Sequence, residues 1–459
     1  MAPRILRSIS SDQQHENKKT FAIIILLISV LIIDTSLFRI SDLIRVYVTP
    51  GWTTTLFVFM SVAYLVGQHI LIGFARTKSR QVRALGYLHL NILDKSVAIT
   101  QYLLAGILAF VLLQVLMFSN FYTSVISAAG VISYLMAIFM MMFLTLRFFS
   151  WFRLHKNLVV LFYFLSTITL TINAAFSFAL ILNVSPGIPS LVGESQIAGM
   201  TRPIAASPFA NALNNGYTIT SILSFILLWV ATSLLLREYS KRIGRITYWA
   251  LVSIPLVYFL SQFPALFFNL FDSLIISNPT LFGIVLTLIF SLSKIAGGIL
   301  FGIAFWTIAK NLPDNTVVKS YMIIAAYGLV LFYISNQAGS SLFQLGGVYP
   351  PFGLLTITII GLSSYLMLIG IYSSAVSVAQ DSRLRRAIKK SVQRQSSLLD
   401  KIGTAQMQQE IENRVLSTIK SQAENLRSET GIETSLDENE MREYMNEVIV
   451  NIMTKKIEK

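Results

Sequence analysis

Long stretches without charged side chains recur along this chain and constrain its fold more than any other feature. Ten mostly apolar segments lie between positions 20 and 379, and about 20 such residues cross the roughly 30 Å hydrocarbon core of a bilayer as a helix. Only 13% of the residues are charged, whereas soluble domains contain about 25%. We therefore predict an all-α, polytopic membrane helix bundle. The expected spans are 20–38, 52–75, 97–118, 124–146, 157–182, 215–236, 246–268, 281–309, 317–335 and 353–379.

Basic side chains are distributed unevenly between the loops and predict an orientation. If residues 1–19 form a cytoplasmic N-terminal segment, 18 Lys and Arg residues fall in inner segments and only three in outer ones, namely Arg39, Arg45 and Arg202. Short cytoplasmic loops of membrane proteins retain Lys and Arg. We therefore expect a multi-pass plasma membrane protein with both termini in the cytoplasm. The net charge of +14 then reflects topology and attraction to the lipid bilayer, and we predict no nucleic-acid partner.

The last eight predicted spans indicate two four-helix units, 97–236 and 246–379. Asn173 recurs as Asn336 at an offset of 163 residues, and basic residues that precede each asparagine keep the same offset. A duplication with an even number of spans would give parallel repeats about an axis along the membrane normal. The alternative is a chance alignment, because every inner loop requires Lys or Arg.

Lys294 lies near the middle of the eighth predicted span and is the most informative single residue. A lysine at the centre of a membrane helix costs about 2.5–3.5 kcal/mol on insertion scales, so it usually faces a partner or a water-filled cavity. Asp34, in the outer part of the first span, is the natural partner, and Asp272 is the alternate. Asn173 and Asn336 would complete a polar network. These five residues form our candidate ligand or ion site.

Two structural interpretations of Lys294 compete with the ligand site. The lysine could form a structural ion pair, or its stem could bend the amine toward an aqueous vestibule. Gly297, Gly298 and Gly302 follow it in the sequence, and small residues at such spacing favour close helix packing in membranes.

The chain carries no motif that indicates catalysis or a cofactor. It contains no cysteine, which excludes thiolate metal ligands and cysteine nucleophiles. The four histidines are isolated from one another, and no paired catalytic carboxylates or phosphate-binding loop occurs. We therefore predict neither an enzyme, nor a cofactor, nor a metal site.

Residues 380–459 differ sharply in composition from the spans. They contain 14 Lys and Arg and 13 Asp and Glu residues, which predicts a soluble cytoplasmic tail. Its basic start, 383–394, is expected to rest on anionic lipid. The last membrane helix is expected to continue to about Ile402, with Gly403 as a stop and Thr404 as the N-cap of the next helix.

Two amphipathic helices are predicted in this tail, at about 405–428 and from Ser435 onward. Their apolar positions recur every three or four residues: Met407, Ile411, Val415 and Ile419, and then Met441, Met445, Val448 and Ile452. Short helices cannot bury such stripes alone. We expect residues 404–457 to pack on each other, on a second copy, or on a protein partner, for example as a coiled coil.

Two functions are compatible with these features. The first is a membrane sensor or scaffold that couples the bundle to the cytoplasmic helices, which the tail favours. The second is a secondary transporter or permease with a midplane site around Lys294, which the repeat and the buried lysine favour.

Overall fold

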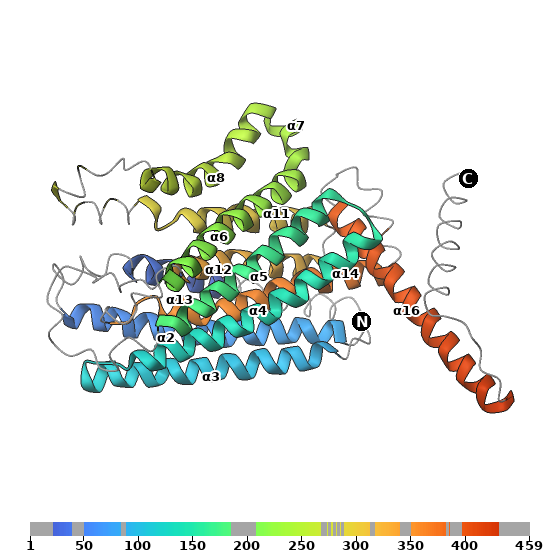
Figure 1. The fold of residues 1–459 in the computed structure, drawn as a ribbon, viewed down its shortest axis with the longest axis horizontal. Coiled ribbons are helices and arrows are strands. Elements are labelled where there is room, and N and C mark those ends of the chain that lie inside the picture. The colour runs from blue at the N-terminus through green and yellow to red at the C-terminus, as the bar shows by residue number, and fades with distance from the viewer. Residues whose placement is uncertain are drawn as a thin grey trace, which may run out of the picture.

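The computed structural model describes residues 22–38, 50–83, 89–184, 208–267, 289–312, 317–339, 350–381 and 397–430, together with a few positions between 273 and 285 and residue 385. Within these ranges the regular secondary structure is entirely helical. Long helices lie side by side in a bundle, and one helix leaves it at one end (Figure 1).

Eight helices in the described ranges are long and apolar enough to cross a membrane. They confirm the prediction of an all-α, polytopic membrane helix bundle. They are α2 (Pro50–Arg83), α3 (His89–Phe118), α4 (Thr123–Leu154), α5 (Leu158–Val184), α6 (Pro208–Leu236), α8 (Arg245–Phe267), α12 (Val317–Gly339) and the segment formed by α13 (Leu354–Thr358) and α14 (Ile360–Gln380). The first predicted span corresponds to a shorter apolar helix, Ala22–Phe38, and the eighth to α11 (Ser293–Asn311). The short helices η2 (Arg237–Tyr239) and α7 (Ser240–Ile243) connect α6 to α8.

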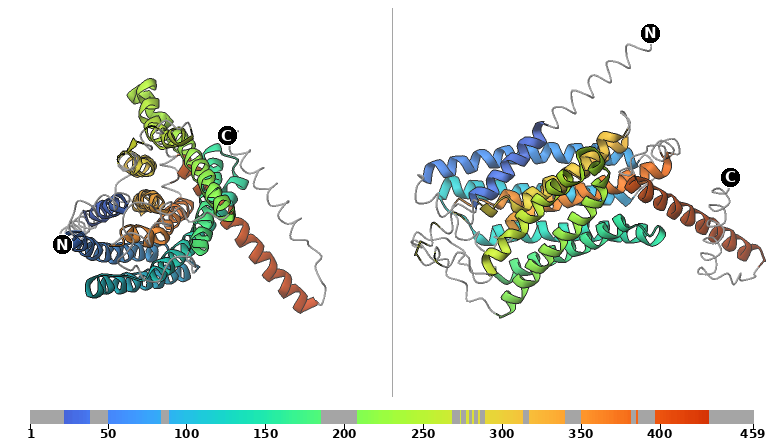
Figure 2. Two further views of the ribbon diagram at one scale, coloured as in Figure 1. Left: turned by 60° about the vertical axis from the view of Figure 1, so that its left-hand side comes forward. Right: turned by 90° about the horizontal axis from the view of Figure 1, so that it is seen from above.

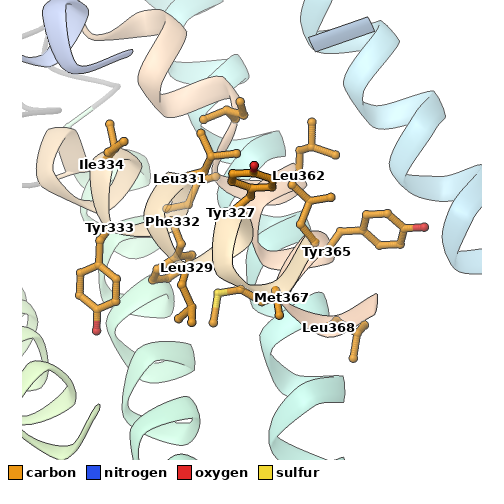
Figure 3. Packing of buried hydrophobic residues seen from close by; sticks show 14 of the residues in the cluster. Tyr327, Leu329, Leu331, Phe332, Tyr333, Ile334, Leu362, Tyr365, Met367 and Leu368 are labelled. Atoms are coloured by element: carbon orange, nitrogen blue, oxygen red, sulfur yellow. The ribbon is translucent and has the colours of Figure 1, made fainter. Parts of the chain in front are cut away.

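α14 forms the centre of the bundle. Every residue in its most apolar window is buried by other parts of the protein, and it packs mainly on α12 and α4. The approach to α12 is very close, because a Cβ on Gly370 would lie 2.5 Å from the backbone nitrogen of Ala325. A Cβ on Gly328 would likewise lie 2.6 Å from the backbone nitrogen of Met367. Large side chains from both helices then fill the space beside this backbone contact (Figure 3).

α8 lies at the edge of the bundle, where it packs on α6 and α11 (Figure 2). Only 17% of its most apolar window is buried. Its contact with α6 includes stacked rings of Phe225 and Phe259, with centroids 4.0 Å apart, and a 2.8 Å hydrogen bond from the Trp229 indole to the Val252 carbonyl.

The described helix ends that flank the loops predicted to be cytoplasmic lie at one end of the bundle. α2, α4, α6, α11 and α14 run toward the end from which α16 (Ser397–Thr430) emerges (Figures 1 and 2). Arg153, Lys241 and Lys310 lie in the last turns of helices that end there. The duplication of the units 97–236 and 246–379 stays a prediction.

The prediction of a helix stop at Gly403 and an N-cap at Thr404 is wrong. α16 runs without interruption through both residues and is 34 residues long. The glycine is explained by packing, since a Cβ at Gly403 would lie 2.4 Å from Cγ1 of Val378 on α14. Glycine therefore allows α16 to approach the bundle and does not end it.

The first turns of α16 belong to the bundle, and the later ones project beyond it. Leu399, Ile402 and Ala405 are buried, and the Trp151 indole of α4 donates a 3.1 Å hydrogen bond to Gln406 Oε1. In contrast, Ile411 is 44% exposed.

Of the predicted tail surface, Met407 and Val415 are half-buried. Ile419 lies in α16, but its side chain is outside the described residues. The predicted third helix also lies outside them, with Met441, Met445, Val448 and Ile452.

Candidate functional site

The eighth predicted span, 281–309, is interrupted just before Lys294. Ser291 and Leu292 form a turn, Leu292 has φ −100° and ψ 2°, and α11 begins at Ser293. The Phe290 carbonyl before the turn accepts hydrogen bonds from the Ser293 hydroxyl at 2.9 Å and from the Gln337 side-chain amide at 3.4 Å. These side chains replace the backbone bonds that a continuous helix would supply.

The amine of Lys294 is buried, with only 7% of the residue exposed. It donates a 2.9 Å hydrogen bond to the Tyr217 hydroxyl and a 3.3 Å hydrogen bond to the Asn336 carbonyl. Asn336 lies in the last turn of α12, where backbone carbonyls lack partners within the helix. A cation is favourable there, because the negative end of the helix dipole faces it.

Asn173 joins the same group through the backbone of α6. Its side-chain amide donates to the Tyr217 carbonyl at 2.9 Å and to the Thr220 hydroxyl at 3.1 Å. The Tyr217 hydroxyl also lies 3.4 Å from the Asn336 carbonyl, to which it donates. We call Lys294, Tyr217, Asn336 and Asn173 the Lys294 cluster. It brings together three of the five predicted residues, with contributions from α5, α6, α11 and α12.

Lys294 lies at the end of α11 that is far from α16. Lys294 is the second residue of α11, and Lys310 is near the other end of the same helix. The 16 residues between them correspond to about 24 Å along the helix axis, most of the roughly 30 Å hydrocarbon thickness.

Asp34 lies in a different polar group and does not pair with Lys294. Its carboxylate accepts hydrogen bonds from the backbone N–H groups of Gly353 at 2.9 Å and Thr356 at 3.0 Å, and from the Thr356 hydroxyl at 2.7 Å. Asp34 thus caps the N-terminus of α13, where negative charge is favourable. Gly353 has φ 88°, a conformation that favours glycine, and a Cβ there would lie 3.1 Å from the Phe38 ring.

The other end of α13 is also held by side chains. The helix is interrupted at Ile359, which differs from the continuous span expected over 353–379. The Ile357 carbonyl accepts a 2.8 Å hydrogen bond from the Ser133 hydroxyl, and the Thr358 carbonyl accepts one of 3.3 Å from the Gln101 amide. Because buried backbone groups in a membrane must be satisfied within the protein, these side chains make the interruption possible.

A second buried carboxylate, Asp94 in α3, was not predicted as a site residue. It accepts hydrogen bonds from the hydroxyls of Ser79 and Tyr365. Asp272 lies outside the described residues. Among the described residues, no three His, Asp or Glu side chains gather as a metal site would require.

Sequence reasoning missed Tyr217, which is the centre of the Lys294 cluster. No local pattern distinguishes it from the other span tyrosines, and its role depends on contacts with residues 77 and 119 positions away. Comparison with known proteins adds no further guide: no family model, no curated protein and no solved structure matches this chain.

Proposed function

We propose that this integral membrane protein is of the sensor or scaffold type and couples its transmembrane bundle to a cytoplasmic helical interaction module. One observation carries the proposal. α16 is a single helix whose first turns are buried against α14 and α4, while the remainder projects from the bundle (Figure 1). Because a helix is stiff over this length, a displacement at its buried turns would be transmitted to the projecting part.

A continuous set of contacts connects the Lys294 cluster with α16. Lys294 binds Asn336 on α12, and α12 packs on α14, as Figure 3 shows for part of this contact. α14 in turn contacts α16 around Gly403 and Val378. Packed helices with close backbone contact shift as units, so the α12 and α14 pair is the element proposed to move.

The orientation and the partners complete the proposal. Arg153, Lys241 and Lys310 lie at the α16 end, and the preference of cytoplasmic loops for Lys and Arg favours a cytoplasmic location for that end, in the plasma membrane. Arg385 donates a 2.7 Å hydrogen bond to the Ala379 carbonyl at the end of α14, and the basic segment 383–394 is proposed to contact anionic lipid as well. Residues 404–457 are the proposed surface for a protein partner or a second copy. No catalytic role is proposed.

A distance measurement tests the coupling. The chain contains no cysteine, so spin labels attached to Ser417→Cys on α16 and Ile243→Cys on α7 would report one distance without background labelling. Both residues are exposed. We expect Lys294→Met to shift or broaden the distance distribution measured by double electron–electron resonance in lipid nanodiscs.

Lys310→Met provides the matched control, because this lysine lies on the same helix but is exposed. It should leave the distance distribution unchanged. If Lys294→Met folds, as shown by its gel-filtration profile and circular dichroism, and gives the distribution of the control, coupling between the bundle and α16 is excluded.

A secondary transporter is the second candidate, because two membrane segments are interrupted, before Lys294 and at Ile359. Interrupted helices form the substrate and ion sites of many transporters. Proteoliposomes that contain a trapped pH-sensitive dye would test proton coupling under an imposed membrane potential. Transport is supported if protons enter vesicles with wild-type protein faster than protein-free vesicles, and if Lys294→Met abolishes this difference. Equal rates of proton entry into wild-type, Lys294→Met and protein-free vesicles would oppose transport.

A further inference from the structure

We propose that the Lys294 cluster binds the carboxylate group of a small organic anion, which enters from the end of the bundle opposite α16. This inference rests on the proposed function and deepens it, since it names the class of ligand to which the bundle would respond. Four properties of the described residues support it: charge, unused donors, local helix geometry and position.

The buried ammonium group lacks a carboxylate partner among the described residues. The two carboxylates buried in the described membrane helices are both engaged elsewhere, Asp34 by the N-terminus of α13 and Asp94 by Ser79 and Tyr365. The contacts of Lys294 are with neutral oxygens, from Tyr217 and Asn336. The carbonyl end of α12 compensates this charge only in part, because a buried ammonium group without a counter-ion remains unfavourable, so the site is electrostatically suited to an anion.

Lys294 and Asn336 have hydrogen-bond donors that the described contacts do not use and that could bind such an anion. A lysine ammonium group has three N–H donors, and the described contacts of Lys294 use two of them. The side chain of Asn336 is also buried, at 3% exposure. In the described part of the chain its amide N–H groups have no acceptor, although its oxygen lies 3.5 Å from the Tyr217 hydroxyl. A carboxylate accepts several hydrogen bonds and could use donors from both residues.

The N-terminus of α11 also favours a negatively charged ligand. Lys294 lies in its first turn, which contains no acidic residue, and the N-cap residue Leu292 offers no side-chain hydrogen bond. The first N–H groups of a helix have no partner within the helix and favour negative charge. A cation in the first turn is therefore unfavourable by itself and becomes favourable when an anion lies between it and the helix terminus.

The position of the cluster determines the side of entry. Lys294 is separated from the α16 end of the bundle by nearly the whole of α11, and Asn336 lies in the last turn of α12. Tyr217 lies nine residues after the start of α6, about 14 Å along the helix axis, so a path to the amine from the opposite end is shorter than one from the α16 end. A carboxylate is favoured over a divalent anion, because the described cluster contributes a single positive charge.

Ligand-observed NMR tests the proposal with the full chain in detergent micelles. The probes are acetate, lactate and butyrate, each compared with its neutral amide, which has nearly the same shape and no charge. We expect saturation transfer from the protein to at least one carboxylate to exceed that to its amide by about tenfold, the factor that one charge-assisted hydrogen bond supplies. Lys294→Met should reduce the transfer to the amide level, and Lys310→Met should leave it unchanged.

The outcomes separate clearly. If wild-type protein transfers saturation equally to all three carboxylates and their amides, or if folded Lys294→Met retains the difference, the carboxylate site is excluded. Tyr217→Phe gives a second, milder test, since it removes one partner of the amine and should change carboxylate transfer without changing amide transfer. If Asp272→Asn is needed before the carboxylates bind, Asp272 is the partner of Lys294 and the proposed ligand is wrong. Binding is measured without reference to α16, so its failure is distinct from a failure of coupling.

Discussion

Removal of the Asp34 carboxylate should destabilise the fold through the N-terminus of α13. In Asp34→Ala the backbone N–H groups of Gly353 and Thr356 lose their acceptor, and each unsatisfied buried donor costs about 1–3 kcal/mol. The Thr356 hydroxyl is spared, because the Thr35 hydroxyl remains 3.1 Å away. Two orphaned donors therefore predict a loss of about 2–6 kcal/mol in the free energy of unfolding.

Unfolding by SDS in mixed micelles, followed by circular dichroism, would measure this loss. Asp34→Asn keeps one acceptor oxygen and should lie between Asp34→Ala and wild type. Ser36→Ala is the matched control, since Ser36 lies on the same helix and donates only to the carbonyl four residues before it, Ile32, in the described structure. If Asp34→Ala is no more destabilised than Ser36→Ala, Asp34 does not hold α13 as described.

Three further changes test other contacts. Gly370→Leu should prevent folding, because even a Cβ there meets the backbone of α12, whereas Gly106→Ala has nothing within 4 Å of its new Cβ and should be neutral or slightly stabilising in a gel-filtration thermostability assay. Trp151→Phe and Gln406→Leu should show a coupling of about 0.5–1.5 kcal/mol in a double-mutant cycle on unfolding, the value of one hydrogen bond; additive effects would contradict this contact. Gly403→Ala should lower the midpoint of thermal unfolding despite the higher helix propensity of alanine, and a raised midpoint would show that α16 does not pack closely there.

Much of the fold follows from hydropathy, because the positions of apolar segments are a local property of the sequence. A helix is observed in each of the ten predicted spans. Interruptions of helices were harder to foresee. The break at Ile359 depends on Ser133 and Gln101, which are distant in sequence and lie on other helices.

In the candidate site too, features that depend on contacts between distant residues could not be predicted from the sequence. Lys294, Asn173 and Asn336 could be selected as polar residues inside apolar spans, and the fold brings them together. The expected partner Asp34 was selected by its charge and its place in the first span, and the competition from the N-terminus of α13 could not be read from its neighbours in the sequence. Gly403 illustrates a related difficulty, since a glycine that ends a helix and a glycine that lets another helix approach have the same local sequence signature.

The burial of α14 has a consequence for the biogenesis of the protein. The most apolar window of the segment Leu354–Gln380, which contains α13 and α14, has a mean hydropathy of 2.1 and would enter a bilayer by itself, yet all of this window is covered by protein in the final fold. This segment is also synthesised after the other described membrane helices. The earlier helices must therefore either form an open arrangement into which α14 inserts, or assemble around α14 after it has entered the lipid. Membrane insertion and completion of the fold are consequently separate events for this chain, and a ribosome-stalled product that ends before α14 would retain an unfilled central groove.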